Sequence, residues 1–118
     1  MIDYSPYIKG LRRREAERKA TLEKRRQKAF AIARQIAGML RQDFGATEIY
    51  LFGSVLRPGE FHAHSDIDLA ADGIAPARYL TAVAKALIMA EEFSVDLVDI
   101  SECQPEFEDS ILKKGIKL

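Results

Sequence analysis

The hydrophobic and polar positions of the first 44 residues follow the period of an α-helix. Residues 6–43 contain no proline after Pro6 and are rich in strong helix formers. From residue 30 onward the apolar positions recur at spacings of three and four, namely Phe30, Ala33, Ile36, Ala37, Leu40 and Phe44. This stripe is expected to pack on the protein core. We predict a helix with Ser5 as its N-cap, Pro6 in its first position and Gly45 as its C-terminal stop.

Residues 12–28 of this helix are almost entirely charged or polar. Their only apolar members are Ala16, Ala20 and Leu22. A helix of this composition buries little surface of its own, which favours one that projects from the domain or docks on another chain. A solvated helix is the equal alternative, in which the glutamates pair with basic residues three or four positions away.

After the first helix, short apolar runs replace the helical period. Strands are predicted at residues 48–52, 67–71 and 94–100, because β-branched and aromatic residues gather there between turn residues. Helices are predicted at residues 76–91 and 105–114, each opened by a proline. The apolar face of the first of these is expected to comprise Tyr79, Leu80, Val83, Leu87 and Ile88. This order of elements indicates an α+β (mixed α/β) domain, with a small sheet flanked by helices and a long N-terminal helix.

Length and charge narrow the class of protein. The chain has 118 residues, of which 47% are apolar, and this suits a single compact domain. The net charge of zero conceals +7 over residues 1–44 and −7 over residues 45–118. We therefore expect a basic helical arm followed by an acidic domain. The lone Cys103 cannot form an internal disulfide, and we find neither a bilayer-length apolar run nor a secretory signal pattern. A soluble cytoplasmic protein is expected.

The candidate chemistry centres on a pair of aspartates, Asp66 and Asp68. In a strand, residues i and i+2 face the same side, so the two carboxylates repel unless a cation lies between them. Their hard oxygen donors suit Mg²⁺ or Mn²⁺. Asp96, on the next predicted strand, can complete a three-carboxylate cluster of the kind that holds two metal ions. An Asp-x-Asp pair alone is more often a solvated strand face, and we interpret Asp99 as a surface residue.

A second feature is the Gly53-Ser54 pair at the end of the first predicted strand. Glycine lets the backbone approach a phosphate closely, although an ordinary turn would have the same sequence. Arg57 can pair with a phosphate or cap that turn. His62 and His64 alternate with the two aspartates and would form a zinc or manganese site if the strand began at His62. We favour loop positions for both histidines.

Taken together, the segments L-F-G-S-V-L-R-P-G, S-D-I-D-L-A and V-D-L-V-D-I resemble the minimal nucleotidyltransferase (MNT) family of the DNA polymerase β superfamily. The resemblance covers residues 47–118 and does not include residues 1–28. It implies that Gly53 and Ser54 bind the triphosphate of ATP. Arg57 matches an arginine of the family's Gly-Ser turn. At Pro58 the sequence departs from the family pattern, and the loop that follows is one residue longer.

The resemblance also implies roles for the three carboxylates. Asp66 and Asp68 would ligate two Mg²⁺ ions. Asp96 would ligate the catalytic ion and help to deprotonate the attacking hydroxyl. These three residues are therefore both the expected catalytic residues and the expected metal ligands.

Small members of this family are commonly paired with an all-helical HEPN ribonuclease toxin. The resemblance implies an antitoxin that transfers AMP from ATP to a hydroxyl, namely a tyrosine of the HEPN protein. Two alternatives stay open: an antitoxin that neutralises its partner by contact alone, and a nucleotidyltransferase for small molecules of the aminoglycoside type. The basic arm could contact the HEPN partner or a second copy of the chain. Direct nucleic-acid binding is not expected, because the arm has no interleaved aromatic residues.

Overall fold

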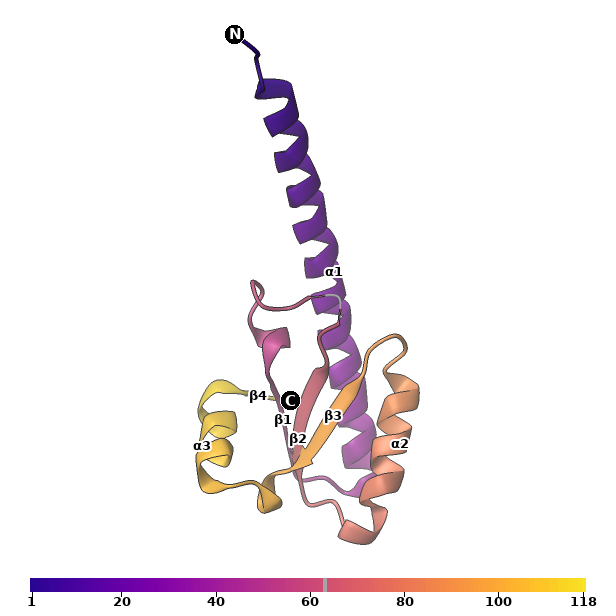
Figure 1. Ribbon diagram of the computed structural model, residues 1–118. Coiled ribbons are helices and arrows are strands. Elements are labelled where there is room, and N and C mark those ends of the chain that lie inside the picture. The colour runs from indigo at the N-terminus through magenta and orange to yellow at the C-terminus, as the bar shows by residue number, and fades with distance from the viewer. Residues whose placement is uncertain (63) are drawn as a thin grey trace.

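Three α-helices and a four-stranded sheet make up the described residues, 1–62 and 64–118, of the computed structural model (Figure 1). The helices are α1 (Ser5–Phe44), α2 (Tyr79–Met89) and α3 (Pro105–Lys114). The strands are β1 (Glu48–Phe52), β2 (Ile67–Asp72), β3 (Val95–Asp99) and β4 (Ile116–Lys117). Short 3₁₀ helices are η1 (Ser54–Leu56), η2 (Pro76–Arg78) and η3 (Ile100–Glu102). The predicted α+β class is confirmed. Over this part of the chain, no helix combines the length and apolar character that a membrane crossing requires.

The sheet separates two apolar clusters. Its strand order is β3-β2-β1-β4; β1 runs antiparallel to both of its neighbours, whereas β2 and β3 are parallel and joined through α2. Alternate residues of a strand face opposite sides of a sheet. In β1, Ile49 and Leu51 accordingly join the main core under α1 and α2, and Tyr50 and Phe52 join a smaller cluster with Ile111 of α3. The sheet thus has α1 and α2 on one face and α3 on the other (Figure 1).

The ends of α1 test the predicted caps. Gly45 adopts the left-handed conformation with φ 71°, and its N–H donates to the Arg41 carbonyl at 3.2 Å, which confirms it as the helix stop. The prediction for Ser5 was wrong, because Ser5 already belongs to the helix and Tyr4 is the N-cap. The carboxylate of Asp3 instead accepts the Ser5 N–H at 2.9 Å, and this hydrogen bonding lowers the pKa of Asp3.

The C-terminal half of α1 belongs to the core of the domain. The buried residues of this helix are Ala29, Ile32, Ala33, Ile36, Ala37, Met39, Leu40 and Phe44. The predicted apolar stripe therefore packs on the sheet, although Phe30 lies half-buried at its edge. Burial along α1 follows the spacing of the apolar residues. It begins at Ala29, well before residue 44, where the basic part of the sequence ends.

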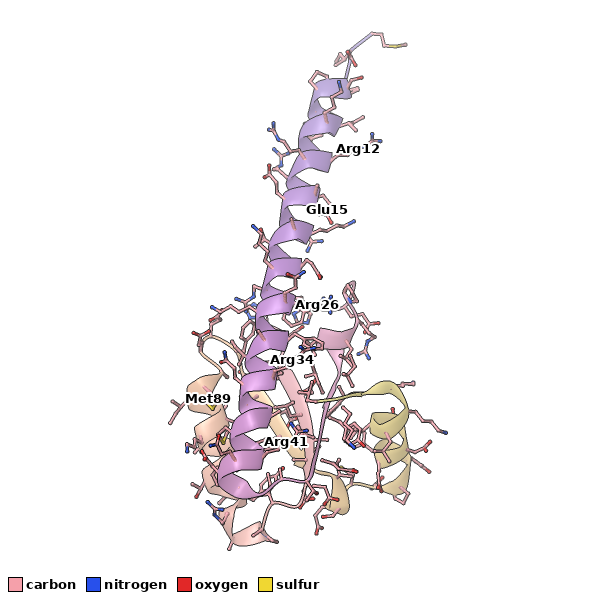
Figure 2. The ribbon with its side chains drawn as sticks, turned by 180° about the vertical axis from the view of Figure 1, so that it is seen from behind. Arg12, Glu15, Arg26, Arg34, Arg41 and Met89 are labelled. Carbon is pink, nitrogen blue, oxygen red and sulfur yellow. The ribbon has the colours of Figure 1, made fainter. Side chains whose placement is uncertain are left out.

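The N-terminal half of α1 extends away from the domain. Residues 1–9 and 11–21 are all exposed, and Figure 2 shows Arg12 and Glu15 on helix that contacts no other element. The radius of gyration is 18.2 Å, compared with about 14 Å for a compact domain of this length. We call residues 5–21 the projecting segment. An Arg18–Glu15 pair at 2.7 Å lies on it, as the solvated-helix alternative expects.

Residues 22–28, predicted to project as well, are instead tied to the domain. The Arg26 guanidinium donates to the Val55 carbonyl at 2.8 Å and pairs with Glu23 at 2.8 Å. Lys28 pairs with Glu92 at 3.0 Å, on the loop that precedes β3. Basic residues of the arm thus contact the acidic half of the same chain. The positive charge of Lys28 is therefore paired with a negative charge of the same chain.

The predicted helix of residues 76–91 forms as η2 followed by α2. Of its predicted apolar face, Tyr79 and Val83 pack against the core as expected, and the other three residues were wrong. Leu80 and Ile88 are 83% and 82% exposed, and Leu87 is also exposed. Ala82 and Ala86 are buried in their place. Their small side chains let α2 lie close to α1, so the shape of the interface outweighs the size of the apolar residues.

Strand β4 was missed by the sequence analysis, whereas β1 and α3 begin and end where they were predicted. A two-residue strand shows no alternation that could reveal it. It pairs antiparallel with β1 directly after Gly115, and the following Leu118 N–H donates to the Ile49 carbonyl at 2.9 Å. A Cβ on Gly115 would lie 2.5 Å from the Ile111 carbonyl oxygen, so only glycine allows this junction.

We expect the projecting segment to contribute little to the stability of the domain and Arg26 to contribute measurably. Deletion of residues 1–21 should leave the free energy of unfolding within about 0.5 kcal/mol, because it removes no buried contact. Arg26→Gln should lower that free energy by about 1–3 kcal/mol, because the Val55 carbonyl loses a charged donor. Denaturant unfolding checks both, with Arg18→Gln as the matched control whose exposed ion pair contributes about 0.5 kcal/mol at most. A similar loss in Arg18→Gln and Arg26→Gln would contradict the assignment.

Candidate active site

Strand register brings two of the predicted carboxylates side by side. Asp68 of β2 is the register partner of Phe52 in β1 and of Asp96 in the parallel strand β3. Residues in register point to the same face of a sheet, so both carboxylates lie on the α3 side, in one row with Phe52. Asp66 lies two residues before Asp68, just ahead of β2, and is exposed. The row lies at the end of the sheet where β1 passes into η1.

Gly53 lies against the Asp68 carboxylate. Its φ of 82° belongs to the region that favours glycine, and a Cβ at this position would lie 2.0 Å from Asp68 Oδ2. Any side chain here would displace the carboxylate. The glycine predicted from the Gly-Ser pair therefore has a steric reason that the sequence could not show. It brings backbone, and no side chain, to the edge of the acidic row.

Burial and neighbouring charge raise the pKa of Asp68 to about 6. Burial is the largest cause, the negative charges of Asp96 and Asp66 add to it, and Arg57 opposes it. The charges of Asp66 and Asp96 therefore both act on the Asp68 carboxylate. Their mutual repulsion is of the kind that a bound divalent cation relieves.

The donor set fits a hard divalent cation, but it is not a preformed cage. Over residues 1–62 and 64–118, we find no three His, Cys, Asp or Glu side chains close enough together to hold a metal ion. Asp68 and Asp96 supply carboxylate oxygens from adjacent strands, which is the chemistry that Mg²⁺ prefers. The exposed Asp66 side chain must approach them to complete a three-ligand group.

Ser54 and Arg57 lie on η1, directly after Gly53. Ser54 is half-buried at the start of η1, and its carbonyl accepts the Arg57 N–H at 3.0 Å. The Arg57 side chain is exposed and paired with Glu60, while its charge still lowers the pKa of Asp68. The arginine is therefore within electrostatic reach of the carboxylates. Its pairing with Glu60 was not predicted, because the loop after Pro58 offered no periodic signal.

The histidines lie in a turn rather than on a strand. The His62 N–H donates to Ser65 Oγ at 2.9 Å, and the Ser65 N–H donates to the His62 carbonyl at 3.0 Å. The His64 N–H donates to His62 Nδ1 at 3.2 Å. Strand β2 begins only at Ile67, so the alternating zinc or manganese arrangement does not form. The predicted loop position of both residues is confirmed.

Asp99 and Cys103 are placed by local structure. Asp99 Oδ1 accepts the Ser101 N–H at 2.9 Å and the Ser101 hydroxyl at 2.7 Å, which caps η3 at the far end of β3. Cys103 is half-buried with its Sγ 3.3 Å from the Asp99 carbonyl oxygen, and burial raises the pKa of its thiol. A thiol with a raised pKa is a poor nucleophile. Neither residue takes part in the carboxylate row.

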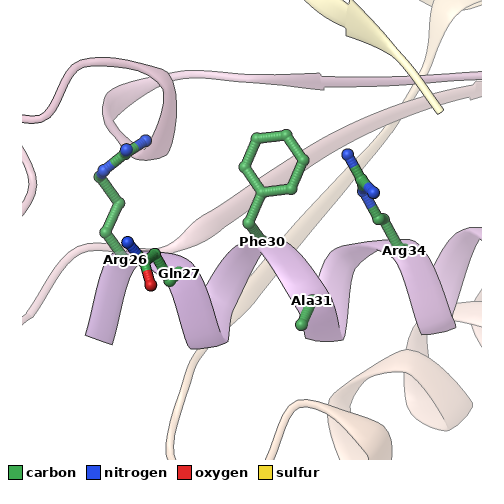
Figure 3. Close-up of a pocket in the computed structure, with 5 residues that line it drawn as sticks. All are labelled: Arg26, Gln27, Phe30, Ala31 and Arg34. Atoms are coloured by element: carbon green, nitrogen blue, oxygen red, sulfur yellow. The ribbon is translucent and has the colours of Figure 1, made fainter. Parts of the chain in front are cut away.

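Two hollows of similar volume differ in their relation to the carboxylate row. One of about 360 Å³ lies along α1 between Arg26 and Arg34, with the Phe30 ring between them, and has no carboxylate in its lining (Figure 3). Another of about 370 Å³ lies between η1 and α3 and includes Gly53 in its lining. Because Gly53 also touches Asp68, only the second hollow is shown to adjoin the carboxylate row.

A carboxylate row beside a Gly-Ser turn at the end of a small mixed sheet is the arrangement expected for the nucleotidyltransferase class. Residues 34–118 match the family described as polymerase beta, nucleotidyltransferase. The match covers well over half of the chain, so this protein belongs to that nucleotidyltransferase family. The family resemblance found in the sequence is confirmed.

Solved structures extend the likeness. A toxin–antitoxin complex with AMP-PNP contains a chain 27% identical to this one, with a TM-score of 0.61 over 72% of this chain and 70% of that chain. An MNT antitoxin complex with the tri-AMPylated HEPN toxin of Shewanella oneidensis gives 22% identity and a TM-score of 0.56, covering 75% and 70% of the two chains. A structure described as a putative minimal nucleotidyltransferase gives 24% sequence identity and a TM-score of 0.54. The match covers 85% of this chain and 95% of that chain. Among curated proteins, none matches this sequence significantly.

We expect Asp68→Asn to stabilise the protein in the presence of a chelator above about pH 6. The folded-state pKa of Asp68 lies above its ordinary value of 3.8, so stability falls as pH rises from about 4 to about 6 and stays lower above that. Because the side chain is partly exposed, the gain from asparagine should be about 1 kcal/mol at pH 8. At pH 4 it should vanish. Urea unfolding at the two pH values checks this, and equal effects at both would contradict it.

Proposed function

We propose that this chain transfers AMP from ATP to a hydroxyl group, using Asp66, Asp68 and Asp96 with two Mg²⁺ ions, and that the acceptor is a tyrosine of a HEPN toxin. The chain would then act as the antitoxin of the pair. One observation carries the proposal: the in-register Asp68 and Asp96 adjoin Gly53 in a chain of the nucleotidyltransferase family.

Each residue of the site has a proposed part in the reaction. When bound, the Mg²⁺ ions supply charge neutralisation of the triphosphate and acidify the attacking hydroxyl. Asp66 and Asp68 would hold the ions, and Gly53 would let the triphosphate approach without meeting a side chain. Asp96 lies on β3, which pairs with β2 on the side away from β1. It would receive the proton of the acceptor hydroxyl. The reaction joins the acceptor oxygen to the α-phosphorus and releases pyrophosphate.

Arg57 and Ser54 would bind phosphate oxygens next to Gly53. The Arg57 guanidinium must exchange its contact with Glu60 for the phosphate, which costs little because this ion pair is exposed. The same exchange would remove a carboxylate from the path of an anionic ligand. Binding of nucleotide is therefore expected to free Glu60.

Two kinds of observation support a HEPN partner. Chains of similar structure belong to a toxin–antitoxin complex with AMP-PNP and to a complex of an MNT antitoxin with an AMPylated HEPN toxin, and this chain covers about 70% of their length. The projecting segment of this chain is basic and exposed, as a surface for an acidic protein requires. A homodimer through the same segment is the rival, and sedimentation with and without the partner separates the two.

Binding to the partner by contact alone is the second candidate function, and the same exposed segment favours it.

ATP binding should depend on the first two carboxylates and on a divalent cation. We expect calorimetry with a non-hydrolysable ATP analogue to show binding in Mg²⁺ and none in EDTA. Replacing both Asp66 and Asp68 with asparagine should abolish it, because the ligands of the ion are lost. Asp72→Asn is the matched control, since Asp72 lies at the opposite end of β2 and should leave the affinity unchanged. Undiminished binding by the double variant would refute the site.

Asp96→Asn should separate binding from transfer. We expect it to bind the ATP analogue as the wild type does, because the third carboxylate serves the acceptor hydroxyl. The rate of AMP transfer to the HEPN partner should fall by about 10²–10⁴-fold. Radiolabelled AMP incorporation measures this. Normal transfer by the variant would refute the role of Asp96, and full neutralisation of the toxin without transfer would favour the contact-only function.

A further inference from the structure

The hollow between η1 and α3 joins two segments that lie more than fifty residues apart in sequence. Its volume is about 370 Å³, and its lining comprises Phe52, Gly53, Leu56, Arg57, Ser110, Ile111 and Lys114. Gly53 borders this hollow on one side and the Asp68 carboxylate on the other. A ligand held by the carboxylate row can therefore extend past Gly53 into the hollow without meeting a side chain at that step.

The lining of the hollow is basic, although residues 45–118 carry a charge of −7. It includes the cations of Arg57 and Lys114 and the hydroxyl of Ser110, and it includes no carboxylate. Over the described residues, no ion pair is found for Lys114, whereas the neighbouring Lys113 pairs with Asp109 at 2.9 Å. A basic lining with one unpaired ammonium suits an anion that carries several oxygens.

Helix α3 is fixed to the site, so the position of Lys114 is set by the fold. Ile111 is only 2% exposed, and the Phe107 ring meets the Phe52 ring edge-on with centroids 5.7 Å apart. Gly115 holds the end of α3 against β1, because a Cβ there would lie 3.1 Å from the Leu51 carbonyl oxygen. The lysine is therefore presented to Gly53 by a packed helix and not by a loop.

We propose that this hollow binds the β- and γ-phosphates of the nucleoside triphosphate, with Lys114 and Ser110 of α3 as phosphate-binding residues. The inference rests on the proposed function, in which Asp66 and Asp68 hold the ions that bind ATP and Asp96 receives the proton of the acceptor hydroxyl. The acidic row needs bound cations to hold phosphate, whereas the basic hollow on the other side of Gly53 attracts the distal phosphates directly. Recognition of the triphosphate tail, rather than of the base, is then the basis on which ATP is preferred over AMP.

A matched pair of lysine variants tests the proposal. The affinities of wild type, Lys114→Gln and Lys113→Gln for a non-hydrolysable ATP analogue, for AMP and for inorganic triphosphate are measured by calorimetry in Mg²⁺. Lys114→Gln should weaken the ATP analogue and triphosphate by about 10- to 100-fold and leave AMP unchanged, because only the tail loses a charged donor. Lys113→Gln should match the wild type for all three ligands. Ser110→Ala should weaken the same two ligands less, and Lys114→Arg should restore most of the affinity.

The outcomes distinguish this inference from the proposed function. If the wild type binds the ATP analogue and Lys114→Gln binds it equally well, the inference is overturned and the proposed function stands. If Lys114→Gln weakens AMP as much as the ATP analogue, or if Lys113→Gln has the same effect, the role of the hollow is likewise overturned. A wild type that binds no nucleotide would reject both. Thermal unfolding of each variant is the control for folding, and we expect unchanged midpoints because Lys113 and Lys114 are exposed.

Discussion

The contact between the Gly53 backbone and the Asp68 carboxylate is the constraint on which the rest of the site depends. Strand β1 must end there in a residue with φ 82° and no side chain, because a Cβ would lie 2.0 Å from Asp68 Oδ2. This close approach fixes the direction of η1 relative to the carboxylate row. It also gives the site two sides, with acidic groups along β2 and β3 and basic groups between η1 and α3.

In the proposed function, the opposite charges of these two sides allow an acidic domain to bind a polyanion. Asp68 is surrounded by Asp96 and Asp66, and burial together with their charges raises its pKa to about 6. A divalent cation that neutralises this row turns a repulsive surface into an attractive one for phosphate. The cations of η1 and α3 need no such ion. The proposed function therefore implies that the affinity for metal and the affinity for the triphosphate are coupled, because each ligand reduces the electrostatic cost of binding the other.

Helix α1 combines a core element with an exposed one. From Ala29 to Phe44 it packs on the sheet, and Arg26 and Lys28 then connect it to Val55 and Glu92. Leu22 and Glu23 are still half-buried, and beyond them residues 11–21 continue as exposed helix. A helix of this kind is continuous because its residues have high propensity and because the packed half nucleates it. The domain therefore presents a basic surface at a distance from the carboxylate row.

Local signals in the sequence determined the elements and the chemistry of the site. The apolar stripe of α1, the left-handed stop at Gly45 and the Asp-x-Asp pair are encoded within a few residues, so period, propensity and motif sufficed to predict them. Tertiary structure decided the rest, because it depends on which surfaces meet. Packing on the core selected Ala82 and Ala86 over Leu80 and Ile88, since small side chains allow close approach. Strand pairing placed Lys114 beside Gly53, a proximity between distant residues that no local pattern records.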